Sequence, residues 1–299
     1  MVSRKLIYSL SAMFSLSLTI FFKKIALLVG VSPLSLLIHF MIVAALFLNI
    51  NFFFFQKKAF TIIRDIRKTE WIFLFFAGFF LLSAYISSTF GLRFTSSINY
   101  SFIIKSNLVF STILAYLFLK ESLFRQKIVL IIIFFIGIYL VTTGGKAIVP
   151  QIGDLLILIA AFFFSVFSIL QKKINRHLTP ETISWAVSTL GALFALLASV
   201  FLKISIFNLA NIQGIVLILL AGLTEGLIIL FMNKTIRVAS VSYYVMMTML
   251  IPVVNGFLGF LFLSETITPV QMLGGIILIL SGISVQKLES QSELTHPAN

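Results

Sequence analysis

A stretch that occurs twice decides the fold of this chain. Residues 77–121 read AGFFLLSAYISSTFGLRFTSSINYSFIIKSNLVFSTILAYLFLKE, and residues 221–265 read AGLTEGLIILFMNKTIRVASVSYYVMMTMLIPVVNGFLGFLFLSE. The two stretches align without a gap, and eleven of their 45 positions are identical. Because both are rich in Leu and Phe, the most informative matches are the charged ones, Arg93 with Arg237 and Glu121 with Glu265. The chain is therefore predicted to consist of two duplicated halves.

The composition is that of a membrane protein. Of the 299 residues, 60% are apolar and 10% are charged, and the mean hydropathy is +1.14. A water-soluble domain of this length needs much more polar surface. The formal charge of +13 does not indicate a nucleic-acid partner, because the Lys and Arg residues stand in short tracts between apolar runs.

Several chemistries are not expected. The chain has no cysteine, so disulfides and Cys-based metal sites are excluded. Its three histidines are scattered, and we expect no metal site and no cofactor. Enzymatic motifs such as HExxH, GxSxG and the phosphate-binding glycine-rich loop are absent from the sequence. We therefore expect a protein that is not an enzyme.

The apolar runs predict ten membrane-spanning segments. A spanning helix needs about 20 mostly apolar residues, and helices pair their own backbone groups in lipid. Cutting the chain at its polar and turn-forming tracts gives segments at about 5–28, 33–55, 70–91, 96–119, 126–144, 152–171, 180–202, 212–234, 239–262 and 268–286. The predicted fold class is an all-α polytopic membrane protein, with ten transmembrane helices arranged as two inverted five-helix repeats.

The basic residues predict the orientation. Lys and Arg are enriched on the cytoplasmic side of membrane proteins. With the N-terminus inside, sixteen basic residues fall on the cytoplasmic side, and five fall outside: Lys23, Lys24, Arg93, Lys146 and Lys203. Both termini are therefore predicted to be cytoplasmic. The expected domains are a first repeat at 5–145, a second repeat at 150–287, and a disordered cytoplasmic tail at 288–299.

The end of each half resembles a known family. Residues 100–141 and 243–283 are similar to the repeat ends of the EamA family of the drug/metabolite transporter superfamily. The second half carries the whole pattern, which is Glu265, Thr268, Gln271, Gly274 and Gly282. The first half departs from it, since Leu130 or a neighbour occupies the expected glycine site. The resemblance implies transport of a small metabolite, and the superfamily carries amino acids, nucleotide sugars, cofactors and drugs.

Two ionisable residues lie deep inside predicted spans. Such residues are costly in lipid and need a partner or a wet cavity. Lys105 is in the fourth span, on one helical stripe with Ser97, Ser101, Thr112 and Tyr116, and Glu225 is near the middle of the eighth. One interpretation is a structural ion pair between the two. The other is that both line the central cavity, where Lys105 binds an anionic substrate group and Glu225 binds a cation or proton.

Other residues are weaker candidates. Hydrogen bonds or aromatic surface for a ligand are expected from Tyr85, Tyr100, Ser101, Asn107, Tyr243, Tyr244 and Asn255, although such residues also simply join helices. Glu121 and Glu265 each precede a span, which predicts a capping or helix-pairing role. Pro252 is expected to break the ninth span and free a carbonyl for a ligand or hinge, and any kink should be one-sided because its repeat counterpart is Leu108. Gly256 and Gly259 are expected to allow close helix approach.

These patterns favour a secondary transporter. The prediction is a gradient-driven carrier of a small metabolite such as an amino acid or a related compound, working by alternating access around a central cavity. The alternatives are a flippase for a lipid-linked or amphipathic substrate and, from another class, an intramembrane enzyme or receptor. Expected partners are a small-molecule substrate, membrane lipid and a proton or other coupling ion, with no nucleic acid. The predicted location is the plasma membrane of a prokaryote, or the inner membrane of a Gram-negative one; monomer or homodimer stays open.

Overall fold

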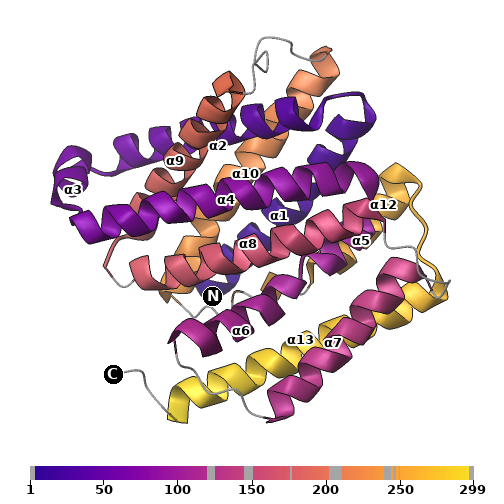
Figure 1. The fold of residues 1–299 in the computed structure, drawn as a ribbon. Coiled ribbons are helices and arrows are strands. Elements are labelled where there is room, and N and C mark those ends of the chain that lie inside the picture. Colours follow the sequence, from indigo (N-terminus) through magenta and orange to yellow (C-terminus); the bar gives the residue numbers. More distant parts are fainter. Residues whose placement is uncertain are drawn as a thin grey trace.

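The computed structural model describes residues 4–119, 125–144, 151–175, 177–201, 211–238, 244, 247–248 and 250–295. Every regular element in these ranges is a helix (Figure 1). The first half contains α1 (Arg4–Leu28), α2 (Pro33–Phe55), α3 (Ala59–Asp65), α4 (Lys68–Phe94), α5 (Ser97–Ile103), α6 (Ser106–Leu119) and α7 (Arg125–Thr143). The second half contains α8 (Ile152–Ile174), α9 (Pro180–Phe201), α10 (Ile212–Val238), α12 (Ile251–Leu263) and α13 (Pro269–Thr295).

Seven stretches are long and apolar enough to cross a membrane. They are α1, α2, α4, the α5–α6 stretch Ser97–Phe118, most of α8, α9 and α10. Shorter apolar helices, Ile128–Val141, Ile251–Leu263 and Pro269–Ser284, lie within the fifth, ninth and tenth predicted spans. The all-helical, multi-span prediction is confirmed. The count of ten spans and the side of the termini stay predictions.

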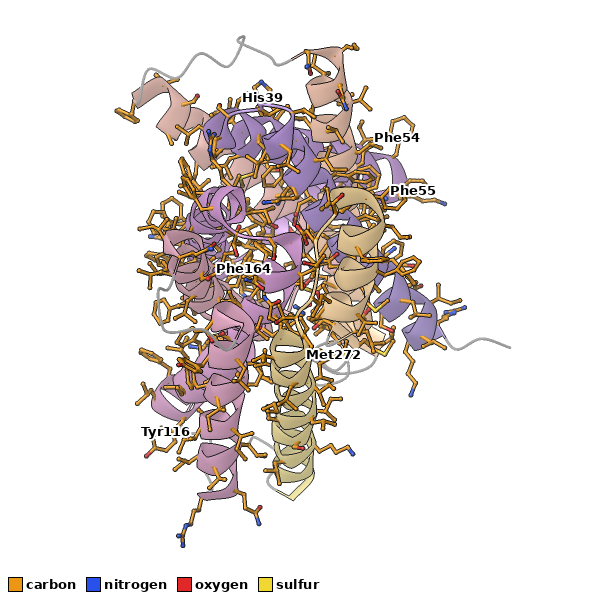
Figure 2. The ribbon with its side chains drawn as sticks, turned by 90° about the vertical axis from the view of Figure 1, so that its right-hand side faces the viewer. His39, Phe54, Phe55, Tyr116, Phe164 and Met272 are labelled. Atoms are coloured by element: carbon orange, nitrogen blue, oxygen red, sulfur yellow. The ribbon has the colours of Figure 1, made fainter. Side chains whose placement is uncertain are left out.

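Large apolar side chains cover the outside of the bundle. Phe54 and Phe55 are 81% and 75% exposed, and Figure 2 shows both of them projecting away from the helices. Met272 of α13 and Tyr116 of α6 are also exposed. A surface of this kind would be very unfavourable in water and suits the hydrocarbon core of a bilayer.

Local signals in the sequence set the turn between the first two spans. Gly30 adopts a φ of +93°, a left-handed conformation that glycine takes without strain. Ser32 then accepts a hydrogen bond from the Ser35 N–H, and Pro33 occupies the first turn of α2. A side-chain cap followed by Pro is a common way to start a helix. The chain therefore reverses direction within a few residues, so that α1 and α2 are consecutive spans.

The fourth predicted span is broken in its middle. Between α5 and α6, the amides of Lys105, Asn107 and Leu108 bond three residues back rather than four. The predicted single stripe from Ser97 to Tyr116 is therefore wrong, because the two segments do not form one continuous helix. The prediction of a one-sided kink is also wrong. Helix α12 begins at Ile251, and its counterpart in the first repeat is Asn107, next to the start of α6. Both halves are therefore interrupted at the same place.

The two halves pack through each other rather than side by side. Helix α1 packs along α10, α4 along α8, and α7 along α13, so each of these pairs joins one half to the other (Figure 1). Glycines allow the closest crossings. A Cβ at Gly222 of α10 would lie 2.5 Å from the Val43 Cβ of α2, and a Cβ at Gly274 of α13 would lie 2.9 Å from the Gly137 carbonyl oxygen of α7.

Two further differences concern helix ends. The short helix α3 between the second and third spans was not predicted. The predicted disordered tail from residue 288 is wrong as far as Thr295, because α13 continues to that residue. Gln, Glu, Lys and Leu are good helix formers, and lengthening an existing helix avoids the cost of nucleation.

Candidate functional site

The buried core contains an ion pair between the two halves. The Nζ atom of Lys23, on α1, lies 3.3 Å from the Oε2 atom of Glu225, on α10. The two side chains are 7% and 4% exposed. Of the two interpretations left open for Lys105 and Glu225, the structural ion pair is therefore not the one this structure contains, and the ligand-binding interpretation stays a prediction. Lys23 was counted among the basic residues on the outer side, at the end of the predicted span 5–28, but its side chain is buried where α1 packs on α10.

Aromatic side chains surround this pair. The Tyr85 hydroxyl, on α4, donates a hydrogen bond to Oε1, the second carboxylate oxygen of Glu225. The Lys23 Nζ atom lies 3.6 Å from the centre of the Phe40 ring and 4.7 Å from that of Tyr85. An ammonium group over an aromatic face is attracted by the ring quadrupole. We call Lys23, Phe40, Tyr85 and Glu225 the charged cluster.

Polar contacts continue around the charged cluster. One turn before Lys23, the Thr19 hydroxyl donates a 2.6 Å hydrogen bond to the Thr224 hydroxyl. Tyr100 and Tyr244 are both close enough to interact electrostatically with Glu225. Of these three predicted tyrosines, Tyr85 contacts Glu225 directly, and Tyr100 and Tyr244 stay candidates. Tyr243 lies outside the described residues.

The sequence contained a signal for Lys23. Ala12, Thr19, Lys23 and Ala26 are all buried, at spacings of seven, four and three residues along α1. This spacing places them on one helical face. Small and polar residues on one face of an apolar helix indicate that it meets another helix, so the lysine on that face belongs to the interior. Thr224 was not among the predicted site residues. A single threonine in an apolar span is common, and its role becomes visible only in its hydrogen bond with Thr19.

Lys105 lies elsewhere in the core. It is 6% exposed, at the break between α5 and α6. The neighbouring Ser101 hydroxyl donates to the Ile98 carbonyl, and the Asn107 carbonyl accepts a 2.8 Å hydrogen bond from Ser165 of α8. These contacts fix the broken segment against the second half. They do not bring Lys105 into contact with the charged cluster.

Asn255 of α12 is buried with unused hydrogen-bonding capacity. It is 1% exposed, and both polar atoms of its amide have no hydrogen-bond partner among the described residues. Leaving a buried amide unpaired costs free energy, so such a group is expected to meet a ligand or water during the working cycle. Asn255 stays a candidate ligand contact.

Glu265 holds the start of α5. Its carboxylate accepts hydrogen bonds from the Ser97 N–H at 2.9 Å, the Ser97 hydroxyl at 2.7 Å and the Ile98 N–H at 3.2 Å. The sequence predicted a capping or helix-pairing role for Glu265, and this contact joins the two halves. Gly259 leaves room for it, because a Cβ there would lie 2.7 Å from the carboxylate. Glu121, the repeat counterpart of Glu265, lies outside the described residues.

The other two structural candidates of α12 compare differently with expectation. Pro252 lies in the first turn of α12, where its missing N–H is not needed, so the ninth span is interrupted just before it, which agrees with the expected break. A Cβ at Gly256 would meet, among the described residues, only the Ile267 Cδ1 atom, at 3.4 Å. Unlike Gly259, Gly256 therefore does not lie at a close contact with another helix in this structure.

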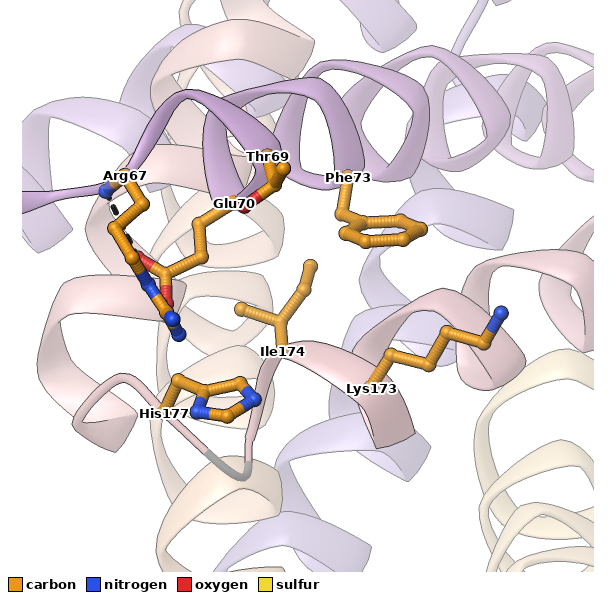
Figure 3. Close-up of a pocket in the computed structure, with 7 residues that line it drawn as sticks. All are labelled: Arg67, Thr69, Glu70, Phe73, Lys173, Ile174 and His177. Atoms are coloured by element: carbon orange, nitrogen blue, oxygen red, sulfur yellow. Dashed lines mark hydrogen bonds and ion pairs between the residues drawn. The ribbon is translucent and has the colours of Figure 1, made fainter.

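The two ends of the bundle differ. Where α4 ends and α8 begins, the Thr95 hydroxyl donates a 2.7 Å hydrogen bond to Asp154, and Lys24 donates to the Thr95 carbonyl at 2.6 Å. Where α4 begins and α8 ends, a cavity of about 390 Å³ lies between the helices. Figure 3 shows its lining residues, which do not overlap with the charged cluster: Arg67, Thr69, Glu70, Phe73, Lys173, Ile174 and His177.

Apolar helices long enough to span a membrane, a duplicated sequence and a buried ion pair between the halves are the features of an integral membrane transport protein. The chain belongs to the EamA-like transporter family, which matches residues 3–143 and 151–285. Both halves are therefore EamA repeats. This is a family of transporters and not of enzymes.

Two relatives are themselves named as transporters. An "Uncharacterized transporter YyaM" of Bacillus subtilis (strain 168) is 27% identical over 198 residues, or 64% of this chain and 64% of its own length. An "Uncharacterized transporter" of Methanothermobacter thermautotrophicus is 29% identical over 120 residues, or 38% of this chain and 35% of its own. The chain thus matches less than two thirds of each relative's length.

A solved crystal structure has the same fold. It superposes with a TM-score of 0.64 at 14% identity, covering 94% of this chain and 98% of its own. At this identity the likeness shows the fold alone.

Proposed function

We propose that this protein is a gradient-driven transporter of a small metabolite, such as an amino acid or a related compound, and that Glu225 couples transport to a proton or another cation. The charged cluster carries the proposal. An ion pair deep in lipid is expensive and offers weak stabilisation, so its presence favours a working role. Lys23 and Tyr85 belong to the first half and Glu225 to the second. The ion pair therefore lies at the contact between the halves, which must move relative to each other in alternating access.

The working cycle follows from the chemistry of Glu225. A proton or a substrate ammonium group that neutralises its carboxylate weakens the contacts with Lys23 and Tyr85 together. The halves are then free to rearrange, and the site opens to the other side by alternating access. The two ends of the bundle differ as one state of this cycle would require. Thr95 and Asp154 are hydrogen-bonded at one end, and a cavity lined by Arg67 and His177 lies at the other.

The topology completes the proposal. Ten spans in two inverted repeats, with both termini in the cytoplasm, agree with the sixteen-to-five distribution of basic residues. The two named relatives are bacterial and archaeal, which supports a prokaryotic plasma membrane. In this membrane a proton gradient is available as the driving force.

Transport in proteoliposomes tests the proposal. The purified chain is reconstituted, and uptake of a labelled amino-acid mixture is measured with and without an imposed pH gradient. We expect the gradient to raise the initial rate, and Glu225→Gln to abolish that increase because an amide does not titrate. The matched control is Glu181→Gln, since Glu181 pairs with Lys234 at 3.5 Å but is 23% exposed. An unchanged gradient response in Glu225→Gln would remove Glu225 from the coupling role.

A further inference from the structure

Among the residues that the structure describes, no carboxylate forms an ion pair with Lys105. Of the nine acidic residues, six are described with a partner near their own helix ends or in the charged cluster: Asp65, Glu70, Asp154, Glu181, Glu225 and Glu265. The remaining three are Glu121, Glu289 and Glu293.

The backbone of α13 passes the break at Lys105 well before it reaches its two glutamates. Helix α13 packs with Gly275 against the Phe102 ring, and Ile283 lies in one apolar cluster with Leu108. Lys105 is therefore level with the segment between Gly275 and Ile283. Glu289 follows Ile283 by six residues, in the direction away from Lys105, and Glu293 is farther still. The six acidic residues whose side chains the structure describes therefore leave this lysine without an acidic partner.

The backbone holds Lys105 at a special position. Its N–H bonds to the Phe102 carbonyl, three residues back, because the helix is interrupted there. The adjacent hydroxyls of Ser101 and Ser106 donate to the carbonyls of Ile98 and Ile103, each at 2.7 Å. No hydrogen bond or ion pair joins the Lys105 side chain to another described residue, although it is 94% buried, 6% being exposed. A buried ammonium without an anion is strongly unfavourable.

We propose that Lys105 is an anion-binding subsite and that the transported solute carries a carboxylate that binds there. This inference rests on the proposed transport function and narrows its substrate class. The charged cluster is neutral as a whole, because Lys23 offsets Glu225. Lys105 is therefore a buried cation outside the charged cluster that pairs with no described carboxylate, and a solute with a single negative charge balances it. An organic acid fits this requirement, and the carboxylate of an amino acid meets Lys105 in the same way.

The binding test uses matched probes on the purified full-length chain. Lactate, pyruvate and benzoate are compared with lactamide, pyruvamide and benzamide, which have nearly the same shape without the charge. Thermal unfolding is followed over a concentration series of each probe, since a ligand that binds the folded state raises the unfolding temperature by mass action. We expect a carboxylate, and not its amide, to stabilise the wild type.

Variants locate the effect at Lys105. Lys105→Met is expected to weaken carboxylate binding by about tenfold to a hundredfold, as for the loss of a charged hydrogen bond. Lys105→Arg should retain part of it. Lys173→Met is the matched control, because Lys173 is also a cation, lining the cavity at the bundle end. Stabilisation of Lys105→Met equal to that of the wild type, or no stabilisation of the wild type by any carboxylate, overturns the proposal.

A second measurement needs no ligand. If Lys105 is unpaired in the empty protein, Lys105→Met removes an unfavourable group, and the variant should unfold at the same or a higher temperature than the wild type. A lower unfolding temperature would show that Lys105 has a structural partner, which contradicts the proposal. The two proposals also fail separately. If Lys105→Met transports neutral amides at an undiminished rate, the transport function stands and the carboxylate substrate class is wrong. If carboxylates stabilise the protein but no solute is transported, the carboxylate site stands and the transport function is wrong.

Discussion

Removing both charges of the Lys23–Glu225 pair should restore much of the stability that removing either one loses. The perturbation is a double-mutant cycle of Lys23→Met and Glu225→Gln. Glutamine keeps an oxygen that can accept the Tyr85 hydroxyl, so the cycle isolates the charge of the carboxylate. Each single variant leaves the other charge buried without its partner, whereas the double variant leaves neither.

The distance gives the magnitude. At 3.3 Å, and with an effective dielectric constant of ~20, the attraction is about 5 kcal/mol. Breaking a buried pair by removing one partner costs about 3–5 kcal/mol, because the remaining charge is uncompensated. Part of the attraction repays desolvation, so the coupling between the two variants should be about 2–3 kcal/mol.

The assay is reversible unfolding in mixed detergent micelles, which reports the free energy of unfolding of all four proteins. The chain supplies a matched control pair, Lys234 and Glu181, at 3.5 Å but with side chains 28% and 23% exposed. A partly exposed pair of this kind should couple by less than about 1 kcal/mol. Equal coupling energies for the two pairs would refute the reasoning, because burial would then make no difference.

Three further predictions follow from other contacts. Tyr85→Phe should lower the stability by about 1.5–3 kcal/mol in the same unfolding assay, since it removes a hydrogen bond to a charged acceptor; no change would show that the hydroxyl is not engaged. Gly222→Val should lower it by about 1–3 kcal/mol or more through overpacking, whereas Gly256→Ala should change it by less than about 1 kcal/mol, and similar losses would contradict the close-crossing assignment. A single cysteine at Asn175→Cys should be protected from an impermeant thiol reagent on intact cells, and one at Ile148→Cys should be labelled; the opposite pattern reverses the orientation.

The sequence predicted most of the architecture because hydrophobic length is a local property. Apolar runs and turn residues such as Gly30 and Pro33 act within a few positions, so most of the long helices fall where they are expected. The break at Lys105 was not predictable in this way. Nothing between Phe102 and Leu108 is a Gly or Pro, and the interruption reflects packing of this segment against α8 and α13.

In the charged cluster, Glu225 and Tyr85 were predicted from the sequence as site residues, whereas Lys23 and Phe40 were not. Glu225 stands alone in an apolar span, and its unusual polarity is visible in any window of the sequence. Lys23 is next to Lys24, near the end of the first span, and resembles a loop residue. Only the packing of α1 on α10, between residues about 200 positions apart, shows which lysine is inside.

The two carboxylate oxygens of Glu225 contact two different helices of the other half, Lys23 on α1 and Tyr85 on α4. These contacts limit which substitutions homologues can accept at the three positions. A relative that loses the acid at this position has no use for an ammonium group on α1 or for a phenol on α4, and each would then be a liability in lipid. We therefore expect the three positions to change together among homologues. Sequences with an apolar residue in place of Glu225 should carry an apolar residue at 23 and Phe at 85, and such sequences would mark a branch whose members use a different driving ion.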